Sequence, residues 1–166
     1  MKKSLTLYTN PMSRGRIARW MLEEVGEPYE TIQLEFGPAM KQGELVALNP
    51  MGKVPVLKHG DTVVSEAAAI CAYLADVFPE KKLAPPLDQR GAYYRWLFFA
   101  AGPVEAAVTA KALGLLAPSE KSGMAGYGAL RRRSTRWSLQ LRAANTLPAI
   151  TSLPPTCTSA RRSAGA

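Results

Sequence analysis

The order of the predicted segments between residues 5 and 77 limits the folds that this chain can adopt. Residues 5–9 alternate side chains with aromatic and β-branched content, which predicts a strand. Apolar residues then recur at helical spacing over residues 14–25, and Gly26 is a typical helix stop. Residues 29–34 predict a second strand. The first half of the pattern is therefore strand, helix, strand.

The second half begins after a polar stretch, residues 35–48, which we expect to be a surface loop that ends in a short helical piece. Residues 53–58 and 62–64 predict a β-hairpin. A helix is then predicted to begin at Ser65-Glu66, with an acid in its first turn, and to end before Pro79. The order strand, strand, helix completes an α/β pattern.

After this α/β pattern the predicted structure changes from a mixed sheet and helix arrangement to helix alone. A proline-rich stretch at residues 81–87 predicts a linker between a domain of residues 1–80 and a partial helical domain of residues 88–130. Within the second part, residues 88–116 predict one long helix with a bend at Gly102-Pro103.

The composition is that of a soluble globular protein, with 47% hydrophobic and 20% charged residues. No apolar run reaches the roughly 18 residues that span a bilayer, and the first residues lack the apolar stretch of a signal peptide. We therefore expect a cytoplasmic protein without a membrane partner, whose two cysteines are reduced.

The net charge of +8 is unevenly distributed along the chain. Residues 1–120 contain 13 basic and all 13 acidic residues, whereas residues 121–166 contain 8 basic residues and no acid. Residues 131–166 show no helical stripe and predict a basic, acid-free and irregular tail. Salt-sensitive nucleic-acid binding by this tail is one alternative function, and no specific nucleic-acid partner is predicted.

Three segments together resemble a known family. Residues 8–16 (YTNPMSRGR), 49–57 (NPMGKVPVL) and 64–70 (VSEAAAI) are similar to the amino-terminal domain of bacterial glutathione S-transferases. The resemblance covers residues 4–87 and continues into the helical part. It implies an α/β thioredoxin-like domain, in which the two halves form a four-stranded mixed sheet, followed by an all-α C-terminal domain that is truncated here.

The resemblance implies a glutathione site in front of the third strand. Val54-Pro55 matches the family's cis peptide bond, and the Val54 backbone would pair with the cysteinyl part of glutathione. From the residues alone, Pro55 is equally consistent with a proline of an edge strand. Lys53 would approach the glycyl carboxylate, and its alternative is a solvated surface lysine.

The γ-glutamyl end of glutathione would lie at the following helix. Glu66 matches the family residue that pairs with the ammonium group, and Ser65 and the helix N-terminus would receive the carboxylate. The family usually has a hydroxyl residue after this Glu, whereas this chain has Ala67, so only its backbone N–H can serve there. The alternatives are a capping serine and an ordinary first-turn acid.

Ser13 is the catalytic candidate that the resemblance implies. The thiol of glutathione, with a pKa near roughly 8.5, is mostly protonated at neutral pH, and a hydroxyl donor beside a helix N-terminus would stabilise the thiolate. The alternatives are a plain N-cap role for Ser13, or donation from Asn10 or Arg14, which lie close by in the sequence.

Other chemistries find little support in the residues. One histidine and two distant cysteines do not predict a metal site. We expect His59 to be a solvated turn residue and Cys71 to be a buried core thiol inside a helix.

The family resemblance therefore predicts a glutathione transferase. It would use glutathione as co-substrate and no metal, activate the glutathione thiol for attack on a small hydrophobic electrophile, serve in detoxification and form a homodimer. The alternative is a truncated, catalytically inactive fragment that still binds glutathione. We further hypothesise that residues from about 131 onward are the product of a reading-frame shift in a GC-rich gene, because such a shift turns Ala, Leu, Asp and Val codons into Arg, Ser, Thr and Pro codons.

Overall fold

The computed structural model describes residues 3–128, so the tail predicted for residues 131–166 lies outside the described residues. The chain divides into two compact units, one ending at Ala101 and the other beginning at Gly102, and each is described by itself.

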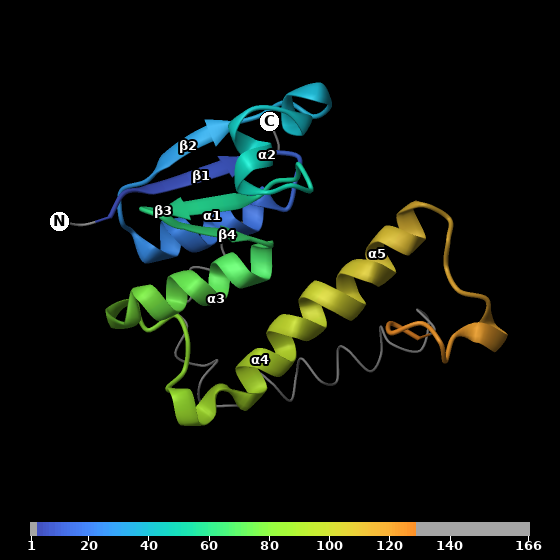
Figure 1. The fold of residues 1–166 in the computed structure, drawn as a ribbon. Helices are drawn as coiled ribbons and strands as arrows, with labels where there is room; N and C mark the ends of the chain where they lie inside the picture. Colours follow the sequence, from blue (N-terminus) through green and yellow to red (C-terminus); the bar gives the residue numbers. More distant parts are fainter. Residues whose placement is uncertain (1–2, 129–166) are drawn as a thin grey trace, which may run out of the picture. The chain divides into compact units, whose positions relative to one another are not determined.

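The first unit is built on a four-stranded mixed sheet, as predicted. Its strands are β1 (Leu5–Thr9), β2 (Glu30–Gln33), β3 (Val56–His59) and β4 (Thr62–Ser65), in the spatial order β2-β1-β3-β4 (Figure 1). The β1 and β2 strands run parallel, and β3 is antiparallel to both β1 and β4. The predicted strand at residues 29–34 is confirmed with shorter limits, and the one at residues 53–58 begins three residues later and ends one residue later than predicted.

Helices cover both faces of this sheet. Helices α1 (Gly15–Val25) and α3 (Ala67–Val77) pack against one face, and the short α2 (Glu44–Leu48) packs against the other (Figure 1). Successive residues of a strand point to opposite faces. The neighbours Leu7 and Tyr8 accordingly belong to the two different hydrophobic clusters, Leu7 beneath α1 and α3 and Tyr8 beneath α2.

The amphipathic pattern of α1 explains its place in the core. Ala18, Leu22 and Val25 are completely buried because they share the stripe that faces the sheet. Gly26 ends the helix in the left-handed conformation, at φ 68°, and its N–H donates to the Leu22 carbonyl. A residue without Cβ adopts this conformation without strain.

The predicted long helix of residues 88–116 is shorter and interrupted. Helix α4 (Arg90–Phe99) leads into a π-helical turn at Ala100–Val104, and α5 (Glu105–Ala112) follows. Gly102-Pro103, where a bend was predicted, lies in this π-helical turn, which accommodates a proline that cannot donate to a regular helix. Among the described residues no helix is long and apolar enough to cross a membrane.

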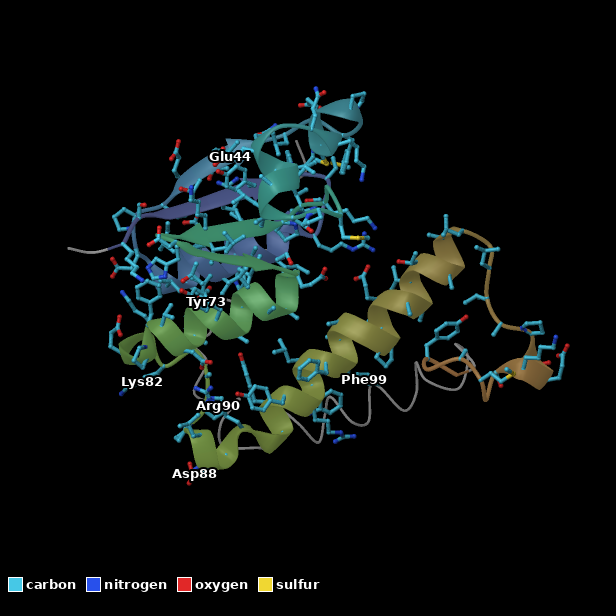
Figure 2. All side chains as sticks on the ribbon, viewed as in Figure 1. Glu44, Tyr73, Lys82, Asp88, Arg90 and Phe99 are labelled. Carbon is cyan, nitrogen blue, oxygen red and sulfur yellow. The ribbon has the colours of Figure 1, made fainter. Side chains whose placement is uncertain are left out.

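The start of α4 is tied to α3 within the first unit. The Arg90 guanidinium forms an ion pair with Asp76 of α3, and its Nε donates to the Pro85 carbonyl at 3.1 Å (Figure 2). The side chain of Arg90 is only 13% exposed, so this contact fixes the direction in which α4 leaves the sheet domain.

Two predictions for single residues have different outcomes. His59 is not a solvated turn residue: it ends β3, and its Nδ1 lies 2.9 Å from the Tyr73 hydroxyl of α3 while its ring stacks beside Phe78. Burial, with a smaller contribution from the Lys3 charge, lowers the pKa of His59. Cys71 is a buried core thiol as predicted, and burial raises its pKa to about 11.

Candidate functional site

The register of the sheet brings three predicted site segments to the same end of its strands. Tyr8 pairs with Val56, and Val56 pairs with Ser65 on its other side. Because β3 is antiparallel to both neighbours, the chain after β1, the chain before β3 and the chain after β4 all emerge at the same end of the sheet. Ser13, Val54-Pro55 and Glu66 lie in these three segments.

Ser13 lies in the turn between β1 and α1. Its hydroxyl donates to the Asn10 carbonyl at 2.7 Å and accepts from the backbone N–H of Gly15 at 2.9 Å. Helix α1 begins at Gly15, two residues later than the serine. The N-cap position is Arg14, which makes no side-chain cap hydrogen bond. From the position before it, the Ser13 hydroxyl satisfies the free N–H of Gly15 at the helix start.

Asn10 positions this turn. It is 4% exposed, its Nδ2 donates to the Leu34 carbonyl at 2.8 Å, and its Oδ1 accepts from the Met12 N–H at 2.8 Å. Both ends of the amide are thus engaged in holding the loop, which argues against Asn10 as the thiol's donor. Apart from the Asn-Pro pair, no local pattern indicates this anchor, because its partner Leu34 is distant in the chain.

Gly15 allows the helix to begin close to the strand. A Cβ atom at this position would lie 1.9 Å from the Thr9 Oγ1 and 2.9 Å from the Ser13 Oγ. Since neither distance is compatible with a real Cβ, only glycine lets the turn pack this tightly. The packing holds the Ser13 hydroxyl against the end of β1.

Tyr8 is not available to the site. It is 3% exposed beneath α2, and burial together with a hydrogen bond to Glu44 raises its pKa to about 12. Glu44 lies on α2, on the face of the sheet opposite α1 and α3 (Figure 2). The tyrosine therefore serves packing on that face.

Val54 and Pro55 directly precede β3. The peptide bond between them is cis, as the resemblance implied. Pro55 is buried and lies before a central strand, so the alternative of an edge-strand proline is wrong. Pairing of β3 with both neighbours begins at Val56, which leaves Val54 outside the ladder.

The loop before Val54 is held by Asn49 and Lys41. The Asn49 Nδ2 donates to the Lys53 carbonyl at 2.9 Å, and the Lys41 Nζ donates to the carbonyls of Met51 and Gly52 at 2.9 and 3.2 Å. Lys41 was missed by the sequence analysis, because it comes from the polar stretch before α2. The Lys53 side chain is exposed. Two ammonium groups, of Lys41 and Lys53, thus belong to this corner.

Glu66 has an unusual backbone conformation between β4 and α3. Its φ is 70° and its ψ 122°, a region that residues with a side chain rarely adopt and that is costly to maintain. It is the N-cap residue of α3 rather than a first-turn acid, and no side chain caps the helix there. Ser65, half-buried, ends β4. The exposed carboxylate and the N–H groups that begin α3 are therefore side by side.

The described residues 3–128 contain no group of three or more His, Cys, Asp or Glu side chains arranged to hold a metal ion. The candidate site consists instead of the hydroxyls of Ser13 and Ser65, one carboxylate, two ammonium groups, and backbone groups at Val54 and at the start of α3. Such a set suits a ligand that has an extended peptide-like part and charges of both signs at its ends.

Comparisons with known proteins point in the same direction. The family model described as glutathione S-transferase, N-terminal domain, matches residues 3–76. Glutathione S-transferase 1 of Dianthus caryophyllus is 47% identical over 98 residues, which are 56% of this chain and 43% of that protein. Glutathione S-transferase hmp2 of Hypomyces subiculosus is 36% identical over 94 residues. The chain thus spans less than half the length of these relatives.

Two solved structures are similar to this one. A glutathione transferase from Methylococcus capsulatus has 27% sequence identity and a TM-score of 0.67. The aligned residues cover 84% of this chain and 70% of the Methylococcus chain. A glutathione transferase homologue from Sulfitobacter, solved with bound glutathione, has 28% sequence identity and a TM-score of 0.54. The aligned residues cover 63% of this chain and 52% of the Sulfitobacter chain.

Proposed function

We propose that this chain, whose residues 3–76 match the family model of the glutathione S-transferase N-terminal domain, binds glutathione and activates its thiol. The observation that carries the proposal is the convergence of Ser13, Val54 and Glu66 at one end of the sheet, set by the register Tyr8–Val56–Ser65. The similar Sulfitobacter structure, which is described with bound glutathione, supports the same ligand.

Each part of glutathione has a chemically matched partner in this proposal. The cysteinyl backbone pairs with the Val54 backbone, which the strand ladder leaves out. The γ-glutamyl ammonium pairs with Glu66, and its carboxylate accepts from Ser65 and from the N–H groups at the start of α3. The glycyl carboxylate lies toward the ammonium groups of Lys53 and Lys41.

Ser13 is the donor to the sulfur in this proposal. Its hydroxyl hydrogen turns from the Asn10 carbonyl to the thiolate, while the Gly15 N–H continues to donate to its oxygen. A donor of this kind favours the thiolate over the thiol, whose proton leaves to solvent. The thiolate then forms a carbon–sulfur bond with a hydrophobic electrophile. In a substitution the leaving group departs with the electron pair of the bond that breaks, and in an addition the product takes up a proton from solvent.

The test combines binding and turnover on the full chain. Calorimetry measures glutathione binding, and conjugation of chlorodinitrobenzene measures activity. We expect Glu66→Gln to weaken binding by about tenfold, the value of one charge-assisted hydrogen bond. We expect Ser13→Ala to lower the turnover number by about 100-fold, the usual effect of removing one such donor, with binding little changed.

Two matched variants control this experiment. Glu30→Gln removes an exposed carboxylate at the start of β2, and Ser4→Ala removes an exposed hydroxyl before β1, both outside the three site segments. Both should behave as the unaltered chain does. Absence of glutathione binding by a chain with a sharp unfolding transition, or equal losses in the control variants, would contradict the proposal.

A second candidate function is glutathione binding without catalysis. It is favoured by the helical part, because α4 contains no buried residue although it carries five aromatic side chains between Tyr93 and Phe99. The same assays separate the two functions. Binding that depends on Glu66, together with a conjugation rate of the unaltered chain that equals the uncatalysed rate and does not change in Ser13→Ala, would establish the second. Homodimer formation, a cytoplasmic location and a role in detoxification belong to the first candidate, and light scattering tests the dimer.

A further inference from the structure

A groove of about 420 Å³ lies between α1 and the edge strand β2, on the first unit. Thr9, Pro11 and Gly15, which flank Ser13 in the chain, form one end of its lining, whereas Ser13, Lys53, Val54, Pro55, Ser65 and Glu66 do not line it. Its volume falls within the range of small-molecule sites. The side chains that give it chemical character come from two elements and are Arg16, Arg19, Trp20 and Glu23 of α1 and Thr31 and Gln33 of β2.

The spacing of these residues follows from the secondary structure. Positions 16, 19, 20 and 23 form one stripe of a helix, since residues three or four apart are neighbours on its surface. Thr31 and Gln33 are two residues apart on a strand and therefore point to the same side. The helix stripe and the strand face are thus two walls of one groove.

The charges of the groove do not cancel. The Glu23 carboxylate is already engaged, because the Arg19 Nε lies 3.7 Å from its Oε1 and the Tyr29 hydroxyl donates to the same oxygen at 2.7 Å. Arg16 forms no ion pair within residues 3–128. One guanidinium therefore remains as the net charge of the groove, and it is exposed to any ligand that enters.

Trp20 supplies a large apolar surface next to this charge. It is 48% exposed, an unusual state for a tryptophan on a helix whose opposite stripe is completely buried. Its ring is one helical turn from Arg16. A flat ring stacks well on an indole, and a carboxylate is the natural partner of a guanidinium, while Thr31 and Gln33 provide additional hydrogen-bonding groups.

We propose that the groove between α1 and β2 binds a small planar aromatic carboxylate, with its ring against Trp20 and its carboxylate on Arg16. One unpaired guanidinium suits a single negative charge rather than a polyphosphate. The groove adjoins the proposed glutathione site at Gly15, but Arg16 and Trp20 are not part of that site, so we expect both ligands to bind at the same time.

The test uses 2-naphthoate as the probe and the full chain labelled with ¹⁵N. The indole N–H signal of Trp20, assigned by its loss in Trp20→Phe, reports occupation of the groove. We expect 2-naphthoate to shift this signal in a saturable way, and neutral 2-naphthamide and aliphatic hexanoate to bind at least tenfold more weakly. Saturating glutathione should leave the naphthoate affinity unchanged.

Arg16→Gln and Trp20→Leu should each weaken naphthoate binding by about tenfold. Arg95→Gln is the matched control, because Arg95 is also an exposed arginine beside a tryptophan, with its guanidinium carbon 4.8 Å from the Trp96 ring, yet it does not line the groove. An unchanged melting temperature of each variant confirms that it folds. Equal binding of the amide, an effect of Arg95→Gln as large as that of Arg16→Gln, displacement by glutathione, or no shift of the Trp20 signal would overturn the proposal.

Discussion

The sheet domain and helix α4 use their apolar residues in opposite ways. The largest completely buried side chains all lie on the sheet or on α1 and α3, namely Leu7, Leu22, Val25, Val56, Leu57, Ile70 and Leu74. Helix α4 is rich in aromatic residues, yet none of its residues is buried, and Phe98 is 68% exposed. Apolar composition alone therefore does not produce a core, which requires a second face that packs against the first.

The gene sequence offers the largest test of this contrast. Residues 131–166 contain no acid, and the hypothesis of a frame shift predicts that the codons read one base earlier encode a different and acid-containing segment. The genetic code already restricts the result. The last base of the Trp137 codon, which can only be TGG, joined to an AG-type codon of Ser138, gives GAG, a glutamate codon.

The codons of residues 153–158 sharpen the same prediction. Read one base earlier, the junctions of Leu153-Pro154 and Pro154-Pro155 encode Ser, Thr, Ala or Pro, and the junction of Pro155-Thr156 gives Asp whenever its first base is G. The junction of Thr156-Cys157 is always Leu, Met or Val. The junction of Ser152-Leu153, three codons before that Asp, gives Ser or Thr when Leu153 has a CT-type codon and the Ser152 codon ends in T or A. The earlier frame therefore can hold a Ser/Thr-x-x-Asp capping signal followed by an apolar residue. Sequencing the gene checks this, and a stop codon or an acid-free product in that frame would refute it.

Core truncations compare the two regions directly in stability. Leu57 is completely buried in the central strand, so Leu57→Ala should lower the free energy of unfolding by about 2–5 kcal/mol, through lost burial and the cavity left behind. Phe98→Ala on α4 should cost less than about 0.5 kcal/mol, since this side chain is largely exposed. Urea titration measures both. If the two variants lost similar amounts of unfolding free energy, Phe98 would have to pack against a partner as tightly as Leu57 packs in the core.

Two glycines that both have a positive φ separate the cost of backbone strain from the cost of steric crowding. Gly52, at φ 56°, would place a Cβ 2.4 Å from the Met40 carbonyl oxygen, whereas Gly26, at φ 68°, has no atom within 4 Å of that position. Gly26→Ala should therefore cost only the left-handed strain, about 1 kcal/mol. Gly52→Ala adds a clash with backbone and should cost about 3 kcal/mol. Thermal and urea unfolding of both variants measure the difference, and equal costs would show that the loop before Val54 can move away.

Local patterns predicted the elements well, and distant contacts explain what they missed. The period of the apolar residues placed α1 and α3 within two residues of their observed limits, because that period reflects which side meets the sheet. The anchor of Asn10 is a contact with Leu34, 24 residues away, and leaves no local signal. Helix α4 began two residues later than predicted and α5 ended four residues earlier, since composition does not specify where packing stops.

The candidate site shows the same division. The identities of Ser13, Val54 and Glu66 were available from motifs, and the cis bond followed from the family resemblance. The positive φ of Glu66 and the hydrogen bonds from Lys41 to the opposite loop depend on three-dimensional closure of the chain. Residue types can be recognised in a sequence, whereas the contacts that hold them in place arise only from the fold.

His59 provides the smallest expected effect and the cleanest measurement, because it is the only histidine of the chain. Burial, aided by the Lys3 charge, lowers its pKa in the folded protein, whereas the unfolded chain takes up its proton near pH 6.5. The unfolded state therefore binds more protons between about pH 6.5 and the lowered pKa, and stability falls as the pH decreases from about 6.5 toward that lowered pKa. In His59→Phe, which keeps a ring beside Phe78, stability should no longer change between pH 7.5 and about pH 5.5, where carboxylates remain ionised. Urea unfolding across this range measures it, and an identical pH dependence in the variant would show that another group titrates on folding.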